Sequence, residues 1–509
     1  MTKRAILNNL IFLLALGVVW GTSSCNPKEE DRKLAEMYCG SCHLFPEPKL
    51  LSKDSWVNGV FPEMAIRMGY KNADPTLFDP EEYQRILQNG ALPVRSMISE
   101  KHWNRILRYY QDNAPIESLP QQAPIQLQTN AEMFAPEALW SSPGQSPNFS
   151  LLKVLPQQGA LFAGQREGKI YVFPFGTLKP QDSLFVPSSP SDIQAVGQNQ
   201  FQLLLMGKMD PNDWQNGSLI EIKKEPNRWK LVKRWVKDLN RPVQFVFEDL
   251  NADAKEDWVI SQFGHYLGKL AWHEKGKNGA IIEHELSKVP GARIAHVIDF
   301  NQDGKKDVVA LLTQGNERIV WFKNLGSGKF EEQELARFSP VYGSSYLDIA
   351  DLNQDGKLDL IHSCGDNYDY SYALKAYHGI RIFLNQGNDS CKESKFIPLH
   401  GAGKVLVEDF DQDGKPDLAC TAYFPDYSQT PLAGFVLLKN RGDLNFSALT
   451  FPQCNAANWL LMDKGDIDGD GDVDILLGAC SINNTVPEPL RKDWNKKGIG
   501  VLLLRNQLK

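Results

Sequence analysis

Short apolar runs separated by polar turns recur along most of the chain, from residue 145 to residue 509. In the clearest copies, an apolar run such as residues 295–298 is followed by an acidic turn, and a second apolar run follows that turn directly. A variable loop then leads to a third run, for example residues 319–322, and a fourth run connects to the next copy. Four short strands in a unit of about 50 residues are typical of a propeller blade. The pattern therefore predicts a mainly β fold built from four-stranded blades.

The acidic turn indicates the spacing of the blades. Its copies start at residues 249, 299, 351, 409 and 466, so successive copies lie 50 to 58 residues apart. Two earlier stretches, residues 159–173 and 201–222, keep the strand pattern without the acidic turn, which gives seven blades. The chain ends just after the third strand of the last blade. We expect residues 125–128 to supply the missing strand, because closing the ring removes an open sheet edge.

The acidic turns have the composition of a calcium-binding loop. The last copy places five carboxylates within nine residues, those of Asp466, Asp468, Asp470, Asp472 and Asp474. Carboxylates this close repel one another unless a cation lies between them. Oxygen ligands at alternate positions, with a glycine after the third, suit Ca²⁺. The loops are not EF-hands, because their twelfth residue is not glutamate. The alternative is a set of solvated acidic turns without metal.

The phrase D-x-[DN]-x-D-G-x-x-D resembles the FG-GAP/VCBS repeat family, the seven-bladed calcium propellers related to integrin α heads, and the resemblance covers residues 145–509. It implies four or five Ca²⁺ sites that stiffen the blades. No nucleophile with its base occurs nearby, so we predict no catalytic residue. The implied ligands are Asp299, Asn301, Asp303, Asp307, Asp351, Asn353, Asp355, Asp359, Asp409, Asp411, Asp413, Asp417, Asp466, Asp468, Asp470 and Asp474. A weaker copy, with Ala254 in place of glycine, contains Asp249, Asn251, Asp253 and Asp257.

A separate motif lies near the N-terminus, where Cys39, Cys42 and His43 form C-x-x-C-H. Two thiols at this spacing reach both vinyl groups of one haem, and the histidine that follows offers a ring nitrogen to the iron. The alternatives are zinc, which needs about four ligands although no further cysteine occurs before Cys364, and a redox pair, which belongs in a βαβ pattern. Residues 31–112 read as helical and resemble a small all-α cytochrome c, which implies one covalent haem c.

The sixth ligand of the iron is predicted from the helices around the motif. Ser52 or Asp54 caps a helix through residue 68, residues 80–87 form another, and Ser99 caps the last one. Met64 is the first choice for the distal ligand, and Met97, at the position that is usual in the cytochrome c family, is the alternative. Met68 and His102 are weaker candidates. Any methionine here is also a natural core residue.

The first residues read as a targeting signal. A basic start at Lys3 and Arg4 precedes an apolar stretch, residues 10–20, that is too short for a comfortable membrane span. Residues 1–24 resemble a bacterial lipoprotein signal peptide with Cys25 as the lipidated residue; the alternative is an ordinary signal peptide with a stray cysteine. Residues 25–30 would be a tether, and residues 113–144 a proline-rich linker between the two domains. We expect an outer-membrane lipoprotein, on the periplasmic side or the cell surface, held only by its lipid.

The net charge and the remaining cysteines exclude few classes of function. The net charge is −7, from 55 basic and 62 acidic residues, and the lack of a basic stripe argues against nucleic acid as a partner. An exported protein permits disulfides, so Cys364 and Cys391, and likewise Cys454 and Cys480, are candidate pairs. Buried free thiols, including Cys420, are the alternative.

Together these features predict an exported c-type cytochrome that carries electrons to or from a redox partner protein. The propeller would be its docking or ligand-binding surface, with loops at residues 262–265, 364–378 and 423–429 taking a glycan or a protein. Aromatic side chains in these loops stack on sugars or, equally, pack between blades. One alternative is a propeller dehydrogenase that passes electrons to its own haem, which would make the chain an oxidoreductase. Another is an adhesion module.

Overall fold

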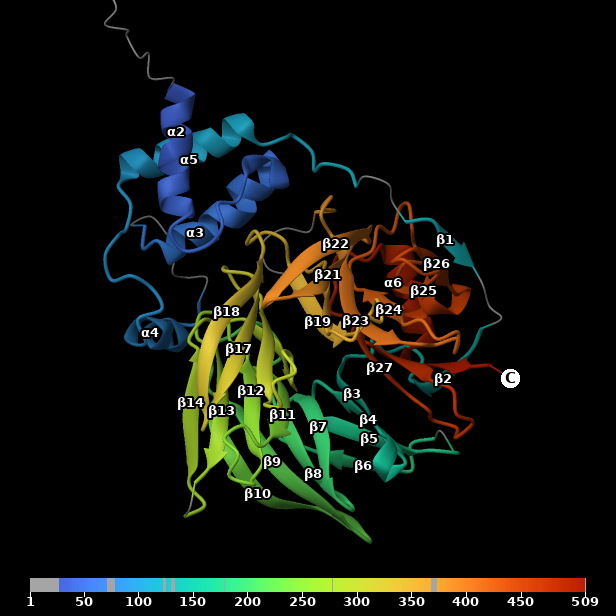
Figure 1. The fold of residues 1–509 in the computed structure, drawn as a ribbon. Coiled ribbons are helices and arrows are strands. Elements are labelled where there is room, and N and C mark those ends of the chain that lie inside the picture. The colour runs from blue at the N-terminus through green and yellow to red at the C-terminus, as the bar shows by residue number, and fades with distance from the viewer. Residues whose placement is uncertain are drawn as a thin grey trace, which may run out of the picture.

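The computed structural model describes residues 27–70, 78–121, 125–129, 133–177, 179–276, 278–367 and 373–508. A helical module formed by the first described residues lies against a ring of seven sheets (Figure 1). The predicted signal peptide, the lipidation candidate Cys25 and residue 26 of the predicted tether lie outside the described residues, whereas residues 27–30 of that tether are helical. No helix within the described part of the chain is long and apolar enough to span a membrane.

The first four blades are regular antiparallel sheets whose strands follow one another along the chain. Blade one contains β3 (Phe149–Leu155), β4 (Ala160–Gln165), β5 (Lys169–Pro174) and β6 (Asp182–Phe185). Blade two contains β7 (Pro190–Gly197), β8 (Gln200–Leu205), β9 (Gly217–Glu225) and β10 (Arg228–Leu239). Blade three contains β11 (Pro242–Glu248), β12 (Asp257–Gln262), β13 (Lys269–Lys275) and β14 (Ile281–Ser287). Blade four contains β15 (Ala292–Ile298), β16 (Asp307–Leu312), β17 (Arg318–Gly326) and β18 (Lys329–Arg337).

The last three blades complete the ring. Blade five contains β19 (Ser344–Ala350), β20 (Asp359–Cys364), β21 (Gly379–Gly387) and β22 (Ser390–Pro398). Blade six contains β23 (Ala402–Glu408), β24 (Asp417–Ala422), β25 (Phe435–Asn440) and β26 (Phe446–Thr450). Blade seven contains β27 (Trp459–Gly465), β28 (Asp474–Ala479) and β29 (Ile499–Asn506), with helix α6 (Glu488–Lys497) before its last strand. The predicted seven-bladed propeller is confirmed.

The strand that closes the ring is not the expected one. Blade seven is completed by β2 (Phe134–Ser141), which pairs antiparallel with β29. The segment expected there, residues 125–128, overlaps β1 (Leu127–Thr129), which instead pairs parallel with β26 as a fifth strand of blade six. The physical reason is burial, because β2 brings the fully buried Phe134 into the core whereas β1 is half-buried to exposed. Part of the expected linker therefore belongs to the propeller.

The five blades that carry an acidic turn bury their second strand on both faces, which explains the continuous apolar runs after those turns. All six residues of β16 are buried, and so are those of β12, β20, β24 and β28. Between blades three and four, Trp272 packs in one cluster with Val308 and Phe322. Burial of this kind contributes about 25 cal/mol per Å² of apolar surface and drives the ring to close.

Side chains on the inner strands tie neighbouring blades together. Asp192 on β7 accepts a hydrogen bond from Phe245 N at 3.2 Å in the next blade. Asp348 on β19 accepts one from Val407 N at 2.9 Å. Asp463 on β27 accepts one from Val154 N at 2.7 Å, across the closure of the ring. The carboxylates along the channel are therefore held by backbone amides.

The helical module contains α2 (Pro27–Cys39), η1 (Pro48–Leu50), η2 (Ser55–Val60), α3 (Phe61–Arg67), α4 (Pro80–Gln88) and α5 (Glu100–Asn113). The first and last helices, α2 and α5, pack on each other. Ser99 caps α5 as expected, its Oγ accepting from His102 N at 3.2 Å. Trp56 lies 4.5 Å from the ring of Tyr110 in the centre of the module, and both side chains donate to carbonyls of the segment after the cysteine motif. The predicted helices are confirmed.

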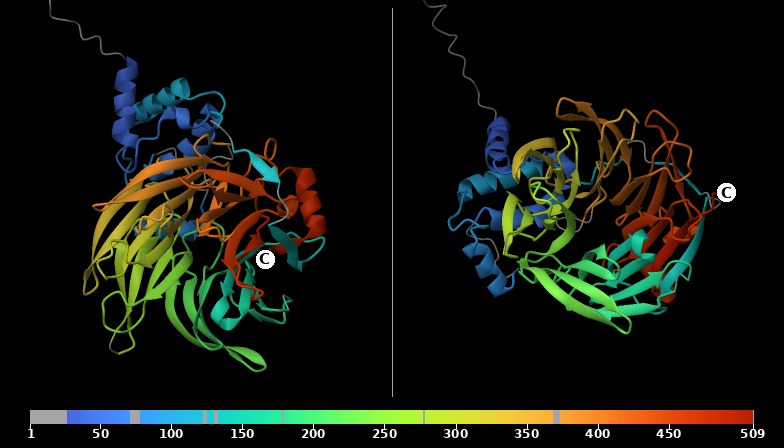
Figure 2. Two further views of the ribbon diagram at one scale, coloured as in Figure 1. Left: turned by 45° about the vertical axis from the view of Figure 1, so that its right-hand side comes forward. Right: turned by 60° about the horizontal axis from the view of Figure 1, so that its bottom comes forward.

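The module lies against the propeller (Figure 2) and contacts loops of blades two to five. Val341, Cys364 and Tyr377 of the propeller share one hydrophobic cluster with the core of the module. Tyr266 in the β12–β13 loop packs with helix residues and donates to Glu63 at 3.0 Å. Two of the loops expected to take a ligand, residues 262–265 and 364–378, therefore adjoin the module, and for Tyr377 the packing alternative holds. Residues 368–372, with three of the tyrosines, lie outside the described part.

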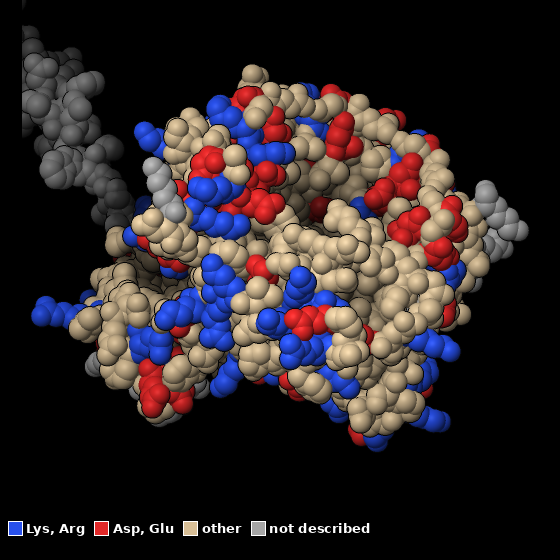
Figure 3. Space-filling model, turned by 90° about the horizontal axis from the view of Figure 1, so that it is seen from below, with Lys and Arg blue, Asp and Glu red and all other residues tan. Residues whose placement is uncertain are grey.

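The five cysteines beyond the motif are free thiols, so neither candidate disulfide is present. Burial raises the pKa of Cys364 and of Cys420 to about 12, which makes these thiols unreactive. Seen from below, Lys and Arg are interspersed with Asp and Glu over the surface (Figure 3). This view shows no large area of a single sign.

Candidate functional site

A cavity of about 360 Å³ lies where the helical module meets the propeller. The motif residues Cys39, Cys42 and His43 line it together, because α2 ends at Cys39 and the turn after it carries the other two. Its apolar wall comes from the module and includes Trp56, Phe61, Trp103, Ile106 and Tyr110. The propeller supplies the remaining wall, with Val289, Pro290, Gln314, Asn316, Pro340 and Val341.

The ring of His43 is oriented by the backbone carbonyl of the next residue, Leu44. Its Nδ1 lies 2.9 Å from the carbonyl oxygen of Leu44, and a carbonyl only accepts, so Nδ1 carries the proton. The lone pair is then on Nε2. Burial, assisted by the charge of Arg67, lowers the pKa of His43 and keeps the ring neutral. A neutral ring with a free Nε2 is the form that binds a metal.

The two thiols fit covalent attachment of haem better than a zinc site. Cys39 is half-buried, and burial raises its pKa to about 11, while Cys42 is exposed. Among the described residues that line the cavity there is no acidic side chain and no third cysteine. The motif therefore offers a metal three ligands, one short of a closed zinc site. An apolar cavity with two thiols and an imidazole at one end fits a porphyrin.

Three methionines line the same cavity, namely Met64, Met68 and Met97. Met97 is 51% exposed and is held beside Met68 by a backbone hydrogen bond of 2.9 Å, whereas Met64 is half-buried on α3. His102, the other weaker candidate, is not among the lining residues, and its Nδ1 lies 2.9 Å from the hydroxyl of Tyr38. The structure thus brings both preferred methionines to the motif.

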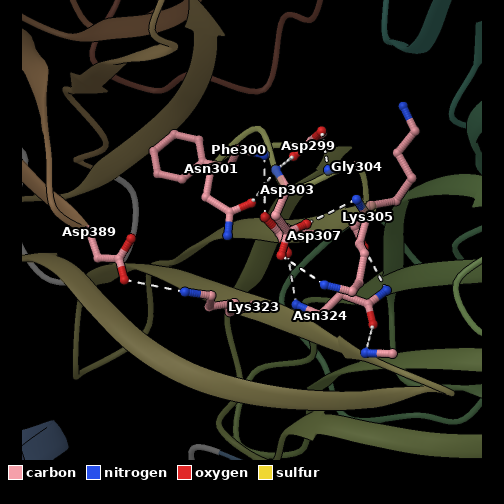
Figure 4. A network of polar contacts seen from close by, with 12 residues as sticks. Asp299, Phe300, Asn301, Asp303, Gly304, Lys305, Asp307, Lys323, Asn324 and Asp389 are labelled. Carbon is pink, nitrogen blue, oxygen red and sulfur yellow. Dashed lines mark hydrogen bonds and ion pairs between the residues drawn. The ribbon is translucent and has the colours of Figure 1, made fainter.

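The acidic turns lie at the opposite end of the strands from this cavity. They connect the first and second strands of a blade, whereas the loops that touch the module follow the second or fourth strand. In the turn of blade four, Asp299 accepts from Asp303 N at 3.0 Å and from Gly304 N at 2.9 Å (Figure 4). Asn301 also accepts from Asp303 N, at 3.2 Å. Blades three, five and six repeat these bonds.

The ninth residue of each turn is a buried aspartate whose carboxylate accepts hydrogen bonds from backbone N–H groups and so fixes the shape of the turn. Asp307 accepts from Phe300 N at 3.3 Å and from Asn324 N at 2.7 Å (Figure 4). The side chain of Asn324 in turn donates to the carbonyl of Leu250 in the turn of blade three, at 2.9 Å. Asn385, Asn440 and Asn506 take the corresponding place in later blades. In the sequence these asparagines indicate only a turn.

A glutamine at the fourth position links one acidic turn to the next. Gln302 donates to the carbonyl of Gly356 at 2.6 Å, and Gln412 donates to that of Gly471 at 3.2 Å. Gln354 makes the same bond to Gly414. The turns of blades four to seven therefore form a connected series. The recurrence of glutamine in three copies is the sequence signal that would have revealed it.

In the turns of blades six and seven, three carboxylates lie close enough together to share one cation. Ligand oxygens of Asp409, Asp411 and Asp413 lie within 4.8 Å of one another, and so do those of Asp466, Asp468 and Asp470. In four turns a lysine at the seventh position neutralises the aspartate at the fifth, as in Lys305 with Asp303 at 3.0 Å. These two clusters fit a cation such as Ca²⁺, which in blade six would compete with Lys415.

The last turn lacks this lysine. Asp472 occupies its place, is 3% exposed, and makes no ion pair with any described residue. Burial and the neighbouring Asp470 and Asp474 raise the pKa of Asp472 to about 6. The only ion pair in this turn among the described residues joins Asp468 to Arg505. The last turn thus carries the largest uncompensated negative charge and fits a cation best.

Comparison with known proteins supports the repeat. A family described as the FG-GAP-like repeat matches residues 299–362 and 409–477, which include the turns of blades four, five, six and seven. No curated protein matches the sequence. Among solved structures, the N-terminal domain of Nup159 is 12% identical over 76% of this chain and 98% of its own, with a TM-score of 0.42. Saccharomyces cerevisiae Sqt1 is 10% identical over 75% of this chain and 100% of its own, with a TM-score of 0.43. The chain thus carries FG-GAP-like repeats within a seven-bladed β-propeller.

Proposed function

We propose that the chain is an exported, lipid-anchored c-type cytochrome that carries electrons, with the propeller as a docking or ligand-binding surface. The observation that carries this proposal is the single cavity shared by Cys39, Cys42, His43 and the methionines. Thiols, an imidazole and a thioether around one apolar space are the side chains that hold haem c.

Each residue has a distinct part in this proposal. The thiols of Cys39 and Cys42 would form thioether bonds, and Nε2 of His43 would bind the iron. Met64 is the preferred second protein ligand, with Met97 as the alternative. Bound there, haem c would supply a one-electron ferric–ferrous couple. The aromatic wall would exclude water from it, which together with methionine ligation would raise the reduction potential.

The propeller would act as a rigid partner of the haem module. Its loops supply one wall of the cavity, so the module stays in place when a redox partner protein binds. Four or five Ca²⁺ ions in the acidic turns would stiffen the blades from the opposite face. The proposal includes export and a lipid on Cys25 at the outer membrane, since haem c is attached outside the bacterial cytoplasm.

Covalent haem on a denaturing gel tests the proposal. The full chain is expressed in cells that mature c-type cytochromes, beside Cys39→Ala and Cys42→Ala, with Cys391→Ala as a control on a thiol outside the cavity. We expect haem peroxidase staining of the wild type and of Cys391→Ala, and strongly reduced staining of the two motif variants. Staining that is absent from the wild type, or equal in all four proteins, would refute it.

A further inference from the structure

A second cavity, of about 180 Å³, opens at the mouth of the central channel of the propeller. It lies on the same face as the helical module, because it is lined by the first residues of inner strands β15, β19 and β23 and by loops that follow second strands. A smaller cavity lies between the two regions. It shares Phe263, Ser344 and Asp366 with the channel mouth, and Gln314, Pro340 and Val341 with the cysteine-motif cavity.

Two buried cationic side chains in this mouth, Arg293 and Lys404, form no ion pair with the described residues. Arg293 on β15 donates from Nε to Ser345 O at 3.1 Å, and its other nitrogens donate to no partner within the described chain. Lys404 on β23 makes no hydrogen bond or ion pair through Nζ with the described residues, and lies 5.2 Å from the ring of Tyr346. Burial lowers the pKa of both side chains, so each charge is unfavourably placed as the protein stands.

The nearby carboxylates form no ion pair with Arg293 or Lys404. Asp192, Asp348 and Asp463 accept backbone hydrogen bonds from neighbouring blades, and their charges favour the ionised form of Lys404 without forming an ion pair with it. At the rim, Asp210 is paired with Arg166 at 2.7 Å. Asp366 lies at the rim as well, and its charge favours the ionised form of Arg293. A third cation, Arg241, is held by the carbonyls of Met209 and Gly264.

The other residues that line the cavity indicate which kind of anion it would bind. It is largely apolar, with Phe263, Phe424, Val243, Leu460 and Ile482 around the two cations. A fully hydrated inorganic anion would leave these walls without contacts. A carboxylate attached to a small apolar body satisfies both parts of the site, since a guanidinium binds carboxylate oxygens and the walls bury the apolar part.

We infer that the mouth of the propeller channel binds a small carboxylate with an apolar body, through Arg293 and Lys404. The ligand would lie on the same face as the cysteine-motif cavity, separated from it by the smaller cavity. This inference does not depend on the presence of haem, because its residues all belong to the propeller.

Calorimetric titration of the full chain tests the inference, with benzoate as the probe and benzyl alcohol as its neutral counterpart. Arg293→Gln and Lys404→Gln each remove one charge, and Ile482→Asp adds a carboxylate to the wall in case the first two are poorly folded. Lys288→Gln, on the exposed surface, is the matched control. We expect saturable benzoate binding that weakens about tenfold or more in the three cavity variants and stays unchanged in Lys288→Gln.

The contrary results are equally specific. Wild-type protein that shows no saturable binding of benzoate would overturn the inference, and so would equal affinities in the wild type and in all three cavity variants. Benzyl alcohol or inorganic phosphate binding as tightly as benzoate would also overturn it, because the cations or the apolar walls would then have no selective role. A haem-free preparation gives the same readout, so failure here is distinct from failure of the proposed cytochrome function.

Discussion

Phe134 and Phe451 meet edge to face in the core, with ring centroids 5.7 Å apart. Phe134 begins the strand that closes the ring, and Phe451 follows the last strand of blade six. The same Phe134 ring lies 6.3 Å from that of Phe410, in the acidic turn of blade six. One side chain near the start of the propeller therefore joins its sixth blade to its seventh.

Removal of the Phe134 ring should loosen the closure of the propeller. Phe134→Ala is expected to lower the free energy of unfolding by about 3–5 kcal/mol, because a fully buried aromatic leaves a cavity. Leu127→Ala in β1, which is only half-buried, should cost about 1 kcal/mol or less. Urea unfolding of both variants measures the difference. A larger loss for Leu127→Ala would show that β1, not β2, holds the ring closed.

Calcium should stabilise the protein, and the last turn should bind it most tightly. We expect chelation by EDTA to lower the melting temperature. Asp472→Lys restores the lysine found in the other turns and should weaken the tightest calcium-binding step about tenfold or more in a calorimetric titration. Asp112→Lys, an exposed change of equal charge on the helical module, is the control. A melting temperature that is unaffected by EDTA would argue strongly against calcium in these turns.

Glu317 should make the stability of the protein depend on pH. It is buried beside the helical module, where burial raises its pKa from 4.5 to about 7 although Gly343 N and Ser344 N donate to it. The folded protein then binds more protons than the unfolded chain between these values, so this contribution to stability is present below pH 4.5 and is lost as pH rises through 7.

Glu317→Gln isolates this effect. Relative to the variant, the wild type should lose stability between about pH 5 and pH 8, by on the order of 2–3 kcal/mol if the carboxyl fully ionises. Denaturant unfolding of both proteins across this range is the measurement. Parallel stability curves for the two proteins would show that the carboxyl does not titrate differently on folding.

The sixth ligand of the proposed haem can be assigned by paired substitution. We expect the methionine-to-iron absorption band of the oxidised protein to disappear in Met64→Ala and to persist in Met97→Ala, because Met64 is the less exposed of the two and lies on a helix of the module. Met37→Ala, on the exposed side of α2, is the control. The opposite pattern would assign Met97, and loss in neither would exclude both.

The repeated blades could be predicted because their signals are local. Each buried second strand follows its acidic turn directly, so one phrase marks both the turn and the strand. The closing strand could not be chosen in this way, since residues 125–128 alternate apolar and polar side chains as an edge strand does. Only the packing of Phe134 against Phe410 and Phe451, far along the chain, decides which segment closes the ring.

The two candidate sites also differ in how far the sequence alone could predict them. Cys39, Cys42 and His43 are adjacent, so their shared role can be read from spacing alone. The propeller wall of their cavity cannot, because Pro290, Gln314 and Val341 reach it only once the module has docked. Arg293 and Lys404 lie on strands of different blades and carry no motif, so nothing in the sequence indicates that they share a cavity.

A spectroelectrochemical titration of the purified full chain tests the central claim most directly. The account predicts the absorption of one c-type haem per chain, which changes reversibly in a single one-electron step and remains attached to the polypeptide after unfolding. A correctly folded chain from cells that mature other c-type cytochromes, with no haem absorption at any applied potential, would contradict it.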